Sequence, residues 1–354
     1  MSRQHQVIAF VIALFCLAIF SQAKIKTPYV FAPKEKLSDY DFFKGNIAEQ
    51  NPQEDVIPYQ LNTPLFSDYA EKLRFVRLPI GAKATYQPEE VIDFPVGTVI
   101  IKTFYYPKDF RNPLKGRQIV ETRLLVKEEN TWSAWTYIWN DTQTDAFLEV
   151  AGETKEISWI HTDGKKKTIQ YSIPNINQCK GCHNRDEKMT PIGLSIRQLN
   201  GTFEYTNEGT MNQLVYWQKH QLISQLPTDS TTWGKIPIWN DPNTGSIDQR
   251  ARAWLEINCA HCHHPQGPAR TSGLFLSYNE KDPIKFGVFK TPVAAGRGSG
   301  GLQYSIVPAK PEESILYYRI NSTDPGVMMP ELGRTIVHQE GALLIKNWIK
   351  SLQP

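Results

Sequence analysis

The sequence predicts an α+β multidomain protein, with an antiparallel β-rich domain in the N-terminal half and helices towards the C-terminus. Residues 99–106, 119–126 and 132–139 are rich in β-branched and aromatic side chains, which favour strands. Residues 246–259 and 340–352 instead repeat apolar side chains at helical spacing. A chain of 354 residues is long enough for two or three domains with sizeable cores.

The first element has the pattern of an export signal. Arg3 precedes an apolar run, residues 7–20, that is too short to cross a bilayer comfortably. Small residues at Ser21 and Ala23 suit a cleavage site, so we expect residues 1–23 to be removed. The mature protein is then expected in the periplasm.

Composition argues against two classes of partner. The formal net charge is only +3 and the basic residues are scattered, so nucleic acid binding is not expected. No stretch after the signal is long and apolar enough to span a membrane. Phe15 precedes Cys16 where a lipoprotein has a small residue, so a lipid anchor is disfavoured.

The β-rich domain is expected at residues 58–173, after an extended, proline-containing arm at residues 24–57. Its strands have the composition described above, and no stretch in this region has a helical period of comparable strength. Residues 157–161 and 167–173 flank an Asp-Gly turn and predict a further hairpin.

The cysteines form two similar motifs, each closed by a histidine. Of five cysteines, one lies in the predicted signal and four belong to Cys179-Lys-Gly-Cys182-His183 and Cys259-Ala-His-Cys262-His263. A disulfide across three residues closes a very small ring and stabilises little, and the two pairs are too far apart for a zinc ribbon. Two thiols on one side of a helical turn, followed by histidine, are the spacing for covalent heme attachment. The sequence therefore predicts two covalently bound c-type hemes, with His183 and His263 as iron ligands.

The second motif lies in the segment at residues 241–354. Ser246 and Gln249 form a capping box before a helix that leads to Cys259. Residues 311–320 are a further helix candidate, and a turn-rich loop follows that contains Met328 and Met329 before a proline.

Residues 246–352 resemble the class I cytochrome c family, in which helices at the two ends cross and a methionine from a late, proline-bearing loop ligates the iron. The resemblance implies an all-α domain here, with Met329 as the ligand opposite His263 and Met328 as the fallback. A thioether opposite imidazole raises the potential of the iron, as an electron carrier requires.

The first motif, in the segment at residues 174–240, departs from that pattern because no long helix precedes Cys179. The sixth ligand of its iron is therefore open. Met189 is the first candidate, ahead of Met211, His220 and His161, and an empty sixth position is the alternative. His261 and His264 are expected to face solvent or a propionate rather than to bind iron.

Four stretches together resemble a family of exported two-heme c-type cytochromes of Gram-negative bacteria. They begin at Asn62 (NTPLFSDYA), Glu121 (ETRLL), Trp139 (WNDTQTDA) and Gln178 (QCKGCH, with PIG at Pro191). The resemblance implies a β-domain fused to two heme segments but no particular reaction. Arg197, near the PIG stretch, is expected to contact a propionate of the first heme.

The favoured function is electron transfer with a redox protein partner in the periplasm. The alternative is an oxidoreductase resembling two-heme peroxidases, with an open sixth position at the first heme. A third class, a carbohydrate or partner-binding module with structural hemes, would place ligand binding in the β-rich domain. No catalytic triad or paired carboxylates can be argued from the sequence.

Overall fold

The computed structural model describes residues 29–353, and the chain from Phe31 onward belongs to one unit of the fold, Phe31–Pro354. The predicted signal, residues 1–23, lies outside the described residues. The longer strands are β4 (Glu71–Arg77), β6 (Val99–Pro107), β7 (Arg117–Lys127), β8 (Trp132–Trp139), β9 (Ala146–Glu149), β10 (Glu153–Ile160) and β11 (Lys166–Ile173). The shorter ones are β1 (Phe43–Lys44), β2 (Asn51–Pro52), β3 (Val56–Pro58), β5 (Ala84–Thr85), β12 (Asn184–Arg185), β13 (Lys188–Met189), β14 (Thr202–Tyr205), β15 (Gly209–Asn212) and β16 (Ile223–Ser224). The α-helices are α2 (Ile176–Cys182), α3 (Ile196–Leu199), α4 (Gln213–Lys219), α5 (Ile247–Leu255), α6 (Ile315–Ile320) and α7 (Gln339–Ser351).

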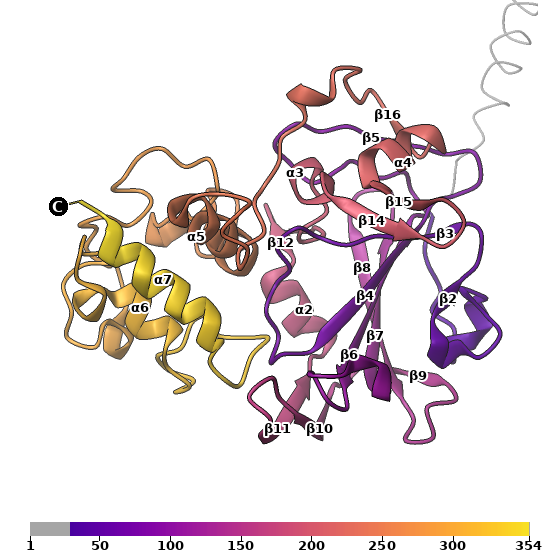
Figure 1. The fold of residues 1–354 in the computed structure, drawn as a ribbon, viewed down its shortest axis with the longest axis horizontal. Coiled ribbons are helices and arrows are strands. Elements are labelled where there is room, and N and C mark those ends of the chain that lie inside the picture. The colour runs from indigo at the N-terminus through magenta and orange to yellow at the C-terminus, as the bar shows by residue number, and fades with distance from the viewer. Residues whose placement is uncertain (1–28, 354) are drawn as a thin grey trace, which may run out of the picture. The chain divides into compact units, whose positions relative to one another are not determined.

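A six-stranded antiparallel sheet forms the N-terminal half, with strand order β3-β4-β6-β7-β8-β9 (Figure 1). The three strands expected from β-branched and aromatic residues are confirmed as β6, β7 and β8. The expected hairpin is also confirmed, because β10 pairs with β11 along its whole length. Strand composition was therefore a sufficient signal for this part of the chain.

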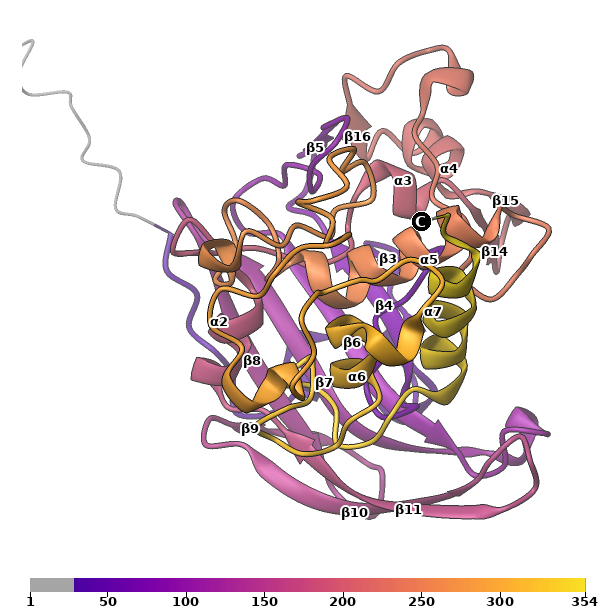
Figure 2. The ribbon, with the colours of Figure 1, turned by 90° about the vertical axis from the view of Figure 1, so that its left-hand side faces the viewer.

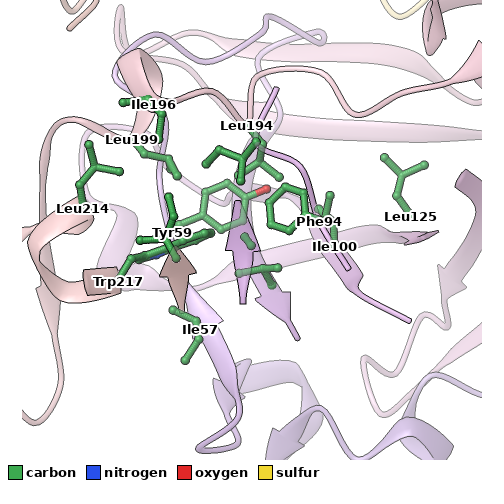
Figure 3. Close-up of a cluster of buried hydrophobic side chains, with 14 of the residues drawn as sticks. Ile57, Tyr59, Phe94, Ile100, Leu125, Leu194, Ile196, Leu199, Leu214 and Trp217 are labelled. Atoms are coloured by element: carbon green, nitrogen blue, oxygen red, sulfur yellow. The ribbon is translucent and has the colours of Figure 1, made fainter. Parts of the chain in front are cut away.

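The sheet buries apolar side chains on both faces because successive residues of a strand point to opposite sides. One face packs Phe75, Ile101 and Leu124 against Leu37 and Phe42, which come from the predicted arm. The other face carries the cluster drawn in Figure 3, where Ile100 and Leu125 of the sheet meet side chains of the following segment. The cluster members labelled there are Ile57, Tyr59, Phe94, Ile100, Leu125, Leu194, Ile196, Leu199, Leu214 and Trp217.

Residues 174–240 are tied to the sheet region by pairing and by hydrogen bonds. Strand β16 pairs in parallel with β5, far earlier in the chain. The Asn62 side chain donates to the backbone carbonyls of Arg197, Asn200 and Ile236 at 3.1–3.2 Å. A short segment rich in loops is held in place by these contacts.

The expected fold class is wrong in its C-terminal part. The described chain is mostly β-rich, with six α-helices, and no all-α class I cytochrome c domain is apparent at the C-terminus. From residue 241 on there are three α-helices, and the stretch between α5 and α6 consists of turns, short 3₁₀ helices and isolated β-bridges. Proline and glycine recur through this stretch and prevent long helices.

The helices that do form there pack together, as Figures 1 and 2 show for α5, α6 and α7. The capping box predicted at Ser246 and Gln249 is confirmed, with both of its hydrogen bonds present. Trp254 of α5 and Trp348 of α7 belong to one buried cluster, and the Trp348 indole donates to Asp248 at 2.8 Å. Along residues 29–353 no helix combines the length and apolar character needed to cross a membrane.

Candidate functional site

Helix α2 carries the first cysteine motif. The helix begins with a capping box, in which the Asn175 side chain accepts from the Gln178 amide and the Gln178 side chain accepts from the Asn175 amide. Cys179 is buried and Cys182 half-buried, and His183 follows at the C-terminal end of the helix. The His183 amide donates to the Cys179 carbonyl at 2.9 Å, which closes the last turn.

The His183 ring is held as a neutral imidazole with one nitrogen free. Its Nδ1 lies 2.9 Å from the Thr190 carbonyl oxygen, which can only accept, so Nδ1 carries the proton. Burial lowers the pKa of His183 to about 3, so the ring stays uncharged. Nε2 therefore keeps its lone pair, which is the state that a metal-ligating histidine needs.

The second motif has the same local geometry on a different helical turn. A π-helical turn, Glu256–Ala260, continues α5 and buries Cys259. The His263 amide donates to the Cys259 carbonyl at 2.9 Å, and burial lowers the pKa of the His263 ring to about 4. Its Nδ1 lies 3.4 Å from the Ser272 hydroxyl, which in turn donates to the Ala269 carbonyl, so the ring again directs Nε2 elsewhere.

Each motif lines a large cavity, and Cys182 of the first motif lines both. The first cavity has a volume of about 560 Å³ and is lined by Cys179, Cys182 and His183 together with strands of the sheet. The second has a volume of about 630 Å³ and is lined by Cys259, Cys262 and His263 together with α6. Both volumes lie within the range of pockets that enclose a cofactor-sized ligand.

The two methionines before Pro330 are divided between these cavities. Met329 lines the second cavity, as expected of the ligand opposite His263, and also reaches the first. Met328 is buried and lines only the first of the two. The geometry thus favours Met329 over the fallback Met328 for the second site.

The two motifs meet although they are far apart in the sequence. The ligand atoms of Cys182, His261 and Cys262 all lie within 4.8 Å of one another. The Cys262 sulfur lies 4.0 Å from the carbonyl of Gly181. A hydrogen bond between the two thiols lowers the pKa of Cys182 and raises that of Cys262, because one proton serves both sulfurs.

The predicted role of Met189 does not fit its position. Met189 is buried in strand β13, beside Asn184, and belongs to the core cluster shown in part in Figure 3. It lines neither large cavity. The other candidates, Met211, His220 and His161, line neither cavity either, and the His220 ring contacts Glu208 at 2.5 Å.

Arg197 is engaged elsewhere as well. It forms ion pairs with Glu89 at 3.3 Å and Glu256 at 3.2 Å. It lines a smaller cavity of about 170 Å³ rather than the first large one. The expected propionate contact by Arg197 is therefore not supported, because its charge is already neutralised by two carboxylates.

His261 was expected to face solvent or a propionate; it is half-buried where the cavities approach one another and lines all three. Its Nδ1 is buried without a hydrogen-bond partner among the described residues. His338, which the sequence did not single out, also lines the first cavity. Its Nδ1 accepts from the Trp254 indole at 3.1 Å, so its Nε2 carries the proton and is unsuited to bind a metal as it stands.

The donor set is that of a group held by two thiols and one imidazole at each site. Family models, curated proteins and solved structures gave no match. Whether the two sites suit a cofactor is therefore judged from their own residues. Paired cysteines, a neutral histidine with a free Nε2 and a cavity of cofactor size coincide at both motifs, and this combination fits covalently attached heme.

Proposed function

We propose that the protein is a two-heme c-type cytochrome that carries electrons between redox partners in the periplasm. The observation that carries the proposal is the coincidence of each Cys-x-x-Cys-His motif with a large cavity, with both motifs meeting at Cys182 and Cys262. When bound, the hemes would supply one-electron redox chemistry. The proposal places the two groups as neighbours, as electron exchange between them requires.

In this proposal the chain has three tasks. Cys179 and Cys182 hold the first heme and Cys259 and Cys262 the second, while His183 and His263 present free Nε2 atoms to iron. Met329 supplies a soft thioether to the second iron, which favours the reduced state.

The test is the absorption spectrum of the protein matured in a host that attaches c-type heme, in oxidised and reduced forms, with and without carbon monoxide. A carrier with both irons six-coordinate, the first through a ligand other than the four candidates that line neither cavity, gives a low-spin c-type spectrum that carbon monoxide does not change. Binding of the gas to half of the iron would instead support the oxidoreductase with an open first heme. Loss of all heme absorption would contradict both.

A different function is favoured by one observation, the cluster of Cys182, His261 and Cys262. Two thiolates and an imidazole are a ligand set for zinc with one position left open. The two proposals exclude each other because a thioether-linked sulfur is no longer a thiolate. Metal analysis of the same preparation distinguishes them: stoichiometric zinc without heme would support the zinc site.

A further inference from the structure

Four basic side chains form a row on the face of the sheet that lines the first cavity. Lys72 and Arg74 come from β4, Lys102 from β6 and Arg123 from β7, and we call them the basic row. Arg74 lies directly opposite Lys102, and Lys102 directly opposite Arg123. Like charges directly opposite one another on neighbouring strands destabilise a sheet, so this arrangement needs a compensating group.

The row interrupts a face that is otherwise apolar. Along β6 the residues on this face are Ile100, Lys102 and Phe104, so a lysine stands between two buried apolar side chains. Arg74 is buried, and the others are half-buried against the cavity. Burying a charge without a partner is strongly unfavourable, even after local relaxation.

The partners within the protein do not neutralise the row. The fully buried Glu121 binds Arg123 at 2.7 Å and also accepts from the Tyr171 hydroxyl. Among residues 29–353, the Lys72 ammonium donates only to two backbone carbonyls, and the Arg74 guanidinium only to one, at 3.4 Å. The Lys102 ammonium makes no hydrogen bond or ion pair with any described residue, and its aromatic contact is the Phe104 ring at 5.5 Å.

The loop facing the row does not supply the missing negative charge either. Asp68 lines the same cavity, but its carboxylate accepts from the amides of Thr335 and Ile336 and from the Thr335 hydroxyl. Arg334 adds a further buried cation, which donates to backbone carbonyls such as that of Met329. Glu331, also on this wall, is exposed.

We propose that the basic row is a binding site for an anionic oxygen group, a carboxylate or a small oxyanion, beside the first cysteine motif. Two sources can supply this chemistry: the propionates of the first heme, or a free oxyanion bound as a substrate. The excess charge is independent of the heme, but the role of the site in redox chemistry depends on the proposed function. Charge-assisted hydrogen bonds from lysine and arginine are the strong contacts that recognise such groups.

The experiment compares the wild-type two-heme protein with Lys102→Met, Lys102→Arg and the control Lys108→Met, which removes an exposed charge just after the same strand. Heme content is measured first, so that failure of heme attachment is distinguished from failure of the anion site. The potentials of both hemes are then measured in sulfate and in chloride at equal ionic strength, and sulfate binding is measured by calorimetry.

If a free oxyanion is the ligand, sulfate binds the wild-type protein and lowers the potential of the first heme. Lys102→Met then weakens sulfate binding about tenfold or more, and Lys102→Arg retains it. If the propionates are the ligand, sulfate has no effect, but Lys102→Met alone lowers the first potential because a positive charge beside the heme is lost. The proposal is overturned if Lys102→Met behaves like Lys108→Met in both measurements.

Discussion

At the scale of single residues, the two motif histidines are distinguished from the others by what their Nδ1 atoms bind. His183 donates to a carbonyl and His263 contacts a hydroxyl, whereas His338 accepts from an indole. The free Nε2 of the first two follows from these partners. The hydrogen bonds of Nδ1 therefore distinguish candidate iron ligands from a histidine that packs in the core. Sequence spacing alone identifies only the histidines of the two motifs.

Replacing Met329 with alanine is expected to leave the second iron without its thioether. The measurements are the methionine-to-iron charge-transfer band, which should disappear, and carbon monoxide binding, which should appear at one heme. Met189→Ala is the matched control, because Met189 lies in the core and lines neither large cavity. It should cost about 2–5 kcal/mol of stability and leave the spectrum unchanged. The band surviving in Met329→Ala would rule out this ligand.

Lys102 makes stability depend on pH in a definite direction. Burial and the neighbouring Arg123 and Arg74 lower its pKa from 10.5 to about 7, so the unfolded chain holds more protons above pH 7. The free energy of unfolding therefore rises as the pH increases from about 7 towards 10.5. The cost of burying the charged Lys102 ammonium is largest below pH 7. Denaturant unfolding across this window without added anions should show the rise in wild type and a smaller rise in Lys102→Met, because burial also lowers the pKa of Lys72. Equal slopes in both proteins would contradict the lowered pKa.

At the scale of elements, α2 shows why a short helix escaped prediction. Seven residues are too few for a periodic pattern, yet Asn175 and Gln178 have the spacing of a capping box. That signal was in the sequence and would have marked where the helix begins, whereas the motif alone indicated only a helical turn at Cys179 and Cys182. Strands β6, β7 and β8 were easier to predict, because β-branched and aromatic residues run through their full length.

Removing the cap should weaken both the helix and the first heme site. Asn175→Ala is expected to cost about 1 kcal/mol and to reduce heme attachment at Cys179 and Cys182 more than at the second motif. Heme-peptide mapping after proteolysis measures each site separately. Asp229→Ala, which removes the cap of a 3₁₀ turn in the same segment, is the control. Equal heme loss in both variants would argue against a specific role of the cap.

The basic row could not be predicted from sequence because it depends on register. In the sequence, Arg74, Lys102 and Arg123 each look like the polar position of an alternating strand and would be assigned to solvent. Only the pairing of β4 with β6 and of β6 with β7 puts them side by side on a buried face. The proximity of Cys182 and Cys262 could not be predicted from sequence either, because it is a tertiary contact.

At the scale of the whole molecule, the sheet region and the C-terminal segment are joined through polar contacts. Asp68 accepts from two backbone amides and one hydroxyl of residues 335–336, and Tyr69 donates to Glu340 at 2.8 Å. The loop that carries Met329 is thereby fixed against residues that lie far earlier in the chain. The all-α expectation failed because this segment depends on such contacts and not on helix packing alone.

Asp68→Ala should loosen this junction. Losing the carboxylate leaves several partly buried donors unpaired and is expected to cost about 3 kcal/mol, whereas Asp68→Asn retains part of the bonding and should cost less. Hydrogen exchange at the Thr335 and Ile336 amides measures the effect directly. Unchanged protection of these amides in Asp68→Ala would show that the junction is held by other contacts.

The intact mass of the mature protein, purified from a host that attaches c-type heme, tests the central claim most directly. The account predicts the mass of the chain without residues 1–23 plus two covalently attached hemes, one lost in Cys179→Ala/Cys182→Ala and the other in Cys259→Ala/Cys262→Ala. A mass equal to the bare polypeptide, or one that retains two hemes after either double substitution, would contradict it.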